Sequence, residues 1–128
     1  MSRKSHPVTK IIIAYAPAVI WASLIFFLSA QEVLPGFTVS LHDFLFKKSA
    51  HMFVYGVLFY LLLRATRQHS GDKSKVFQYA LPLLITLAYA CIDEWHQSTV
   101  PGRYPTGRDI AYDMLGATTV LLHQLKLL

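Results

Sequence analysis

Long apolar segments without charged residues alternate with short polar segments along this chain. Residues 11–31 contain no Asp, Glu, Lys or Arg, and they reach the roughly 20 residues that a helix needs to cross a bilayer core. Residues 49–63 and 76–92 are shorter charge-free segments, and residues 110–125 form a fourth that only Asp113 interrupts. The pattern predicts an all-α fold: a single domain over residues 1–128, an integral membrane bundle of four transmembrane helices at approximately 10–31, 48–65, 76–97 and 108–126.

A soluble helical bundle and a cleaved signal peptide are the two alternatives to this interpretation. The chain is 54% hydrophobic and 15% charged, with a mean hydropathy of +0.40. Four such segments would leave almost no polar face on any helix, which argues against a soluble bundle. The first segment exceeds the roughly 7 to 15 apolar residues of a signal peptide, and residues 28–30 (Leu-Ser-Ala) make a poor cleavage site. We therefore expect a retained first helix.

Basic residues at the helix ends predict the orientation. With four helices, the N-terminal tail, the loop after the second helix and the C-terminal tail share one side of the membrane. That side holds eight of the twelve Lys and Arg residues: Arg3, Lys4, Lys10, Arg64, Arg67, Lys73, Lys75 and Lys126. Lys and Arg concentrate on the cytoplasmic side, so both termini are expected to be cytoplasmic. The net charge of +5 does not indicate nucleic acid as a partner, because the basic residues do not form one stripe.

Six of the seven acidic residues belong to the opposite, extracytoplasmic side. They are Glu32, Asp43, Asp93, Glu94, Asp109 and Asp113. Orientation does not require this partition, because acidic residues contribute little to it. The acids therefore indicate a polar site on that side, built from the ends of the helices that meet there.

Each of these helix ends carries polar residues at helical spacing. Lys48, His51 and Tyr55 follow an i, i+3, i+7 pattern and share one face of the second helix. Other candidates are Ser29 and Gln31 at the end of the first helix, Asp93, Glu94 and Gln97 at the end of the third, Arg103 and Arg108 in the following loop, and Asp109 and Asp113 in the fourth. Thr106 is expected to N-cap the fourth helix, and Cys91 is expected to be a small core residue.

Asp113 carries the strongest single inference. Only about a dozen residues follow it before the apolar segment ends at Leu125, too few to cross the bilayer, so Asp113 lies at or below the membrane surface. A carboxylate at that depth costs at least about 2.5 kcal/mol unless it faces the bundle interior and finds a partner. Lys48, His51, Arg103 and Arg108 are the available partners.

The motifs resemble those of the VanZ-like family, named for a teicoplanin-resistance protein. The matching stretches are Phe27-Leu28-Ser29-Ala30-Gln31, Lys48-Ser49-Ala50-His51 with Tyr55, Asp93-Glu94-Trp95-His96-Gln97, Pro101-Gly102-Arg103, and Thr106-Gly107-Arg108-Asp109 with Asp113 and Gly116. Their order and spacing cover nearly the whole chain, although position 113 is often Asn in the family. The resemblance implies a small multi-pass protein of the bacterial cell envelope, linked in some members to lower teicoplanin susceptibility. It implies no specific reaction.

Two function classes remain open at this stage, and a purely structural ion-pair network is a third. The chain is either a membrane-embedded enzyme or a non-catalytic protein that binds lipids or a glycopeptide; the partner is a membrane lipid or a lipid-linked envelope precursor. Proton transfer would fall to His51, Asp93, Glu94, Asp109 and Asp113. Ligand binding would fall to Lys48, Tyr55, Gln97, Arg103, Arg108, Ser29 and Gln31.

A divalent cation held by Asp93, Asp109 and Asp113 is a variant of this site, because such cations prefer oxygen ligands. It is a minority variant, since the sequence contains no metal motif. The sequence leaves the oligomeric state open.

Overall fold

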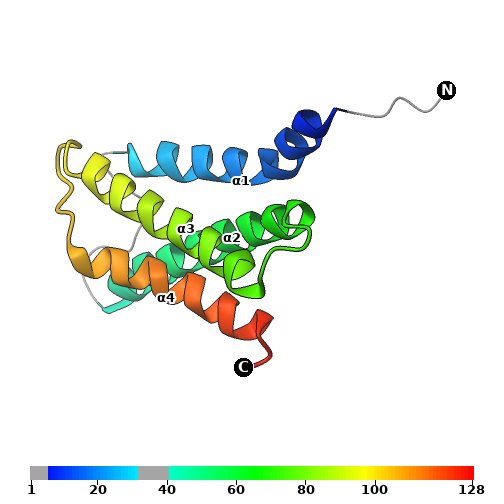
Figure 1. The fold of residues 1–128 in the computed structure, drawn as a ribbon. Helices are drawn as coiled ribbons and strands as arrows, with labels where there is room; N and C mark the ends of the chain where they lie inside the picture. Colours follow the sequence, from blue (N-terminus) through cyan, green and yellow to red (C-terminus); the bar gives the residue numbers. More distant parts are fainter. Residues whose placement is uncertain (1–5, 32–40) are drawn as a thin grey trace.

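The computed structural model describes residues 6–31 and 41–128, and all secondary structure in these residues is helical. The helices are α1 (Pro7–Ser29), α2 (Leu41–His69), α3 (Lys75–Gln97) and α4 (Gly107–Gln124). Successive helices run in opposite directions (Figure 1). The end of α1, the start of α2, the end of α3 and the start of α4 therefore meet at one end of the bundle, on the left of the view.

The predicted start of the second helix is wrong. α2 begins at Leu41 rather than near Lys48, and it continues to His69. Its first turns contain an i,i+4 ion pair between Lys47 and Asp43 at 2.8 Å, a spacing that stabilises a helix although it interrupts the apolar pattern. Lys48 and His51 consequently lie inside a continuous helix and do not open it.

Within residues 6–31 and 41–128, three helices are long and apolar enough to cross a membrane: α1, α2 and α3, with mean hydropathies of 2.4, 1.2 and 1.5 over 18-residue windows. Many of their large apolar side chains face outward; Ile13 of α1, for example, is 66% exposed and Ile20 is 70% exposed. α4 is not among the three, because Arg108, Asp109 and Asp113 all fall within its 18 residues. The chain is thus a multi-pass membrane protein by the character of these helices.

Cys91 is exposed, so its prediction as a core residue is wrong. The adjacent Ala90 is fully buried, which turns position 91 toward the outside of α3. In a membrane bundle, apolar segments face the lipid as well as the core, and an apolar setting in the sequence does not separate the two.

α2 is the centre of the bundle and contacts each of the other three helices. Its Tyr55 and Phe59 are fully buried. The crossing with α4 is so close that a Cβ added to Gly116 would lie 2.0 Å from the backbone oxygen of Met52. Glycine permits this approach of two backbones, a common device in membrane helix pairs.

α1 packs on α2 and α3, partly through polar side chains that bond to backbone carbonyls. Trp21 Nε1 donates to the Val54 carbonyl of α2 at 2.8 Å, and Tyr89 of α3 donates to the Ala22 carbonyl at 2.5 Å. These bonds fix the rotation of α1, and with it the direction in which Ser29 points.

Candidate functional site

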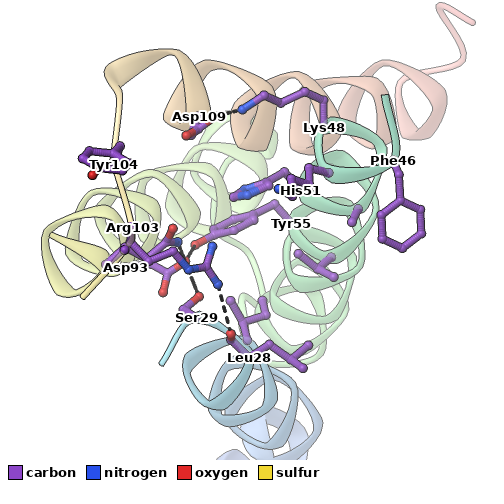
Figure 2. A pocket seen from close by; sticks show the side chains of 16 residues that line it. Leu28, Ser29, Phe46, Lys48, His51, Tyr55, Asp93, Arg103, Tyr104 and Asp109 are labelled. Carbon is purple, nitrogen blue, oxygen red and sulfur yellow. Dashed lines mark hydrogen bonds and ion pairs between the residues drawn. The ribbon is translucent and has the colours of Figure 1, made fainter. Parts of the chain in front are cut away.

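A pocket of about 660 Å³ lies at the end of the bundle where these helix ends meet. One part of its wall is apolar and comes from Ile25 and Leu28 of α1 and from Ala50 and Val54 of α2. The other part is polar and carries most of the predicted site residues (Figure 2). Ser29, Lys48, His51, Tyr55, Asp93, Gln97, Arg103 and Asp109 all line it.

Asp93 is the most heavily hydrogen-bonded group in the pocket. Its Oδ2 accepts from Tyr55 at 2.9 Å, from Ser29 at 3.0 Å and from Gln97 at 3.1 Å. The residue is only 3% exposed. Side chains from α1, α2 and α3 thus converge on one carboxylate oxygen, while Oδ1 has no hydrogen-bond partner among the described residues.

His51 pairs with Asp113. The Nδ1 of His51 lies 2.8 Å from Oδ1 of Asp113, which is 1% exposed and sits behind the histidine rather than on the pocket wall. A carboxylate at Nδ1 fixes the hydrogen on that nitrogen and leaves Nε2 for a ligand. Of the four partners that the sequence offers for Asp113, the fold selects His51, and His51 pairs with neither Asp93 nor Glu94.

Lys48 forms an ion pair with Asp109 across the interface between α2 and α4. Its ammonium also lies 5.6 Å from the ring centre of Phe44 and 5.3 Å from that of Tyr112. Both distances suit cation–π attraction. These contacts hold the Lys48 ammonium beside the pocket, in the upper part of Figure 2.

Hydrogen bonds from Arg103 connect the loop after α3 to the end of α1. Its Nε donates to the Gln31 carbonyl at 3.1 Å, and its Nη2 lies 3.4 Å from the Leu28 carbonyl. A cation at a helix C-terminus satisfies free carbonyls and favours the helix dipole. Partial burial lowers the pKa of Arg103, and Asp93 and Glu94 oppose this shift. Gln31 takes part through its backbone carbonyl. Its side-chain amide donates to the Phe27 carbonyl instead.

Glu94 and Thr106 organise the connection into α4. Glu94 Oε1 accepts from the Thr106 backbone N–H at 2.5 Å. Thr106 occupies the N-cap position as predicted, but its hydroxyl makes no capping bond; it contacts the Asp109 carboxylate at 3.3 Å instead. Glu94 lies outside the pocket wall and positions the loop that carries Arg103.

Arg108 is exposed and does not line the pocket. Glu32 falls outside the described residues. Sequence reasoning did not single out Tyr104 or the apolar wall, both of which line the cavity. The position of Tyr104 beside Arg103 in the loop was the available signal.

No group of three or more His, Cys, Asp or Glu residues in 6–31 and 41–128 is arranged to hold a metal ion. Asp93, Asp109 and Asp113 instead each bond to a separate partner.

The comparisons with known proteins agree with the motifs. The model of the VanZ/LLP1 family matches residues 3–125, nearly the whole chain. No curated protein and no solved structure matches the chain. The chain belongs to the VanZ/LLP1 family.

Proposed function

We propose that all four helices cross the cytoplasmic membrane of the cell, with both termini in the cytoplasm and the pocket in the extracytoplasmic leaflet. The basic residues at the other end of the bundle support this orientation: Arg64, Arg67, Lys73, Lys75 and Lys126. α4 has 18 residues, so it is about 27 Å long, close to the roughly 30 Å of a bilayer core.

A reporter enzyme that is active only outside the cytoplasm tests this topology. Fused after Leu128, the reporter is expected to be silent; inserted in the loop at residues 98–107, it is expected to be active. Activity of the C-terminal fusion combined with a silent loop insertion would place the pocket on the cytoplasmic side.

We further propose that the pocket binds a lipid or lipid-linked ligand whose headgroup carries a phosphate. The observation that supports this is the division of the wall into an apolar part on α1 and α2 and a polar part that includes Lys48 and His51. Acyl chains would lie against Leu28 and Val54, and the phosphate would lie toward Lys48. A cavity of about 660 Å³ is within the size range of small-molecule sites.

An acylated glycopeptide such as teicoplanin is an alternative ligand, with an acyl chain for the apolar part of the wall and a polar body that carries no phosphate. Binding it in the outer leaflet would lower the amount that reaches its target. Membership of the VanZ/LLP1 family motivates this form of the proposal.

A pocket-filling substitution tests ligand binding. Ala50 lies on the apolar wall, and we expect Ala50→Trp to occupy the space that acyl chains would use. In native mass spectrometry from mild detergent, the lipid adduct of the wild-type protein should fall about tenfold in this variant, equivalent to about 1.4 kcal/mol of binding free energy.

Ala111→Trp is the matched control, because Ala111 is exposed on α4 and does not line the pocket. It should keep the adduct of the wild-type protein. Equal adducts on all three proteins, or an adduct on none, would contradict ligand binding in this pocket.

Proton transfer to or from the bound ligand is a second candidate function, favoured by the hydrogen bond between His51 and Asp113. A buried carboxylate that orients a histidine leaves the other ring nitrogen able to take up or release a proton. His51 lines the pocket, so this nitrogen belongs to a residue that a bound headgroup would contact.

A further inference from the structure

Asp93 holds a hydrogen-bond acceptor for which the described part of the chain supplies no donor. Its Oδ1 is buried and has no hydrogen-bond partner among the described residues, although Oδ2 accepts three hydrogen bonds. Buried acceptors nearly always have a partner, because losing hydration without a replacement bond destabilises the protein. A partner from outside the described chain is therefore expected at Oδ1.

The hydrogen bonds of the neighbouring side chains go to other acceptors than Oδ1. Ser29, Tyr55 and Gln97 each donate to Oδ2. Arg103 donates through Nε and Nη2 to carbonyls at the end of α1. Asp93 lines the pocket, so a ligand bound there would lie beside its carboxylate group.

The pocket wall also carries charges of both signs. Lys47, Lys48 and Arg103 line it, and so do Asp93 and Asp109. In Figure 2, Lys48 and Asp93 lie on opposite sides of His51 and Tyr55. Lys48 and Tyr55 are seven positions apart on α2, which corresponds to about 10 Å along the axis and leaves room for two headgroup functions.

We propose that the headgroup bound here carries a hydrogen-bond donor, an ammonium N–H or a hydroxyl O–H, in addition to its phosphate. The donor binds Oδ1 of Asp93, and the phosphate lies toward Lys48 and His51. A headgroup with a phosphate and no donor leaves the Asp93 acceptor unsatisfied and is selected against. This inference rests on the proposed function, because it names the chemical class of ligand for the same pocket.

Two pairs of lipids with identical acyl chains test the inference, since each pair differs in the donor and not in net charge. Phosphatidylethanolamine has N–H donors that phosphatidylcholine lacks. Phosphatidylglycerol has hydroxyl donors that phosphatidylmethanol lacks. In competition for the delipidated protein, measured by native mass spectrometry, the donor-bearing member of at least one pair should be retained about tenfold more, as expected for one hydrogen bond to a charged group.

The Asp93→Asn variant assigns any preference to this residue. The amide oxygen can still accept from the three donors on the Oδ2 side, which places the NH₂ group where Oδ1 was. The NH₂ group of the variant then faces the donor of the headgroup. The ratio of the two lipids retained within each pair should therefore fall to about one. Asp72→Asn is the control, because Asp72 is exposed in the turn between α2 and α3, and it should keep the preference.

Each outcome separates the two proposals. Equal retention within both pairs by the wild-type protein overturns the donor inference and leaves the proposed function standing. Failure to retain any of the four lipids overturns the proposed function as far as it names membrane phospholipids as the ligand. A preference that survives in Asp93→Asn overturns the assignment to Oδ1. If that variant does not fold, the wild-type comparison still decides whether the ligand needs a donor.

Discussion

Gly116→Ala is expected to lower the free energy of unfolding by about 3 kcal/mol, the upper part of the range for overpacking a tight contact. The added Cβ would lie 2.0 Å from the Met52 oxygen, and this atom belongs to backbone that no rotamer change can move. α2 and α4 must therefore separate. His51 precedes Met52 on α2, and Asp113 lies one turn before Gly116 on α4, so their hydrogen bond should lengthen as well.

Thermal unfolding in detergent measures this loss of stability, and Gly→Ala substitutions at two other glycines serve as reference variants. A Cβ at Gly107 meets nothing within 4 Å, so Gly107→Ala should change stability by no more than about 0.5 kcal/mol. A Cβ at Gly56 would lie 3.3 Å from the Val120 Cγ2 atom, a side chain that can adjust, so Gly56→Ala should be intermediate. Equal melting temperatures for the Gly116 and Gly107 variants would show that the two backbones are not in close contact.

Asp113→Ala should cost about 2 kcal/mol, because it removes a hydrogen bond to a charged group and leaves His51 without its partner. Asp113→Asn should cost less, since an amide fills the same space and can still bond to Nδ1. Thermal unfolding of the two variants against the wild-type protein measures the difference. If the alanine variant were as stable as the wild-type protein, the buried pair would not contribute to stability.

The same asparagine variant separates proton transfer from binding alone. It should retain the lipid adduct in either case. If His51 acts as a base or acid, conversion of the bound lipid, followed by mass spectrometry, should slow by roughly a hundredfold or more, because the carboxylate no longer supports the charged histidine. Unchanged conversion in Asp113→Asn would rule out this role for the pair.

The general arrangement of the site follows from the sequence, but its internal pairing does not. Charge-free segments of spanning length and the alternation of helix directions predict that Ser29, Lys48, Asp93 and Asp109 meet at one end. The choice of His51 over Lys48 as the partner of Asp113 depends on the rotation and register of α2 against α4. The close contact at Gly116 sets the rotation and the register of α2 against α4. Because this contact involves two helices, the periodicity of either helix alone does not reveal it.

Long-range contacts account for the other differences. Arg103 bonds to carbonyls at the end of α1, more than 70 positions earlier in the chain, and no local pattern distinguishes this from a free cation in a loop. Glu94 likewise reaches the backbone of Thr106. The early start of α2 was missed because hydropathy finds apolar spans, whereas residues 41–47 extend the helix through the ion pair between Lys47 and Asp43.

Photocrosslinking from α1 would show whether this pocket binds a particular lipid or lipid-linked ligand. Leu28 lines the pocket and Leu24, one turn earlier, does not, although the two are similarly exposed at 40% and 43%. p-Benzoylphenylalanine would replace each in turn, and mass spectrometry would identify the lipids crosslinked in native membranes. If the pocket binds such a ligand, one headgroup class should be enriched among the crosslinks from position 28, and the bulk lipid mixture should be found at position 24. The same mixture at both positions would contradict such binding.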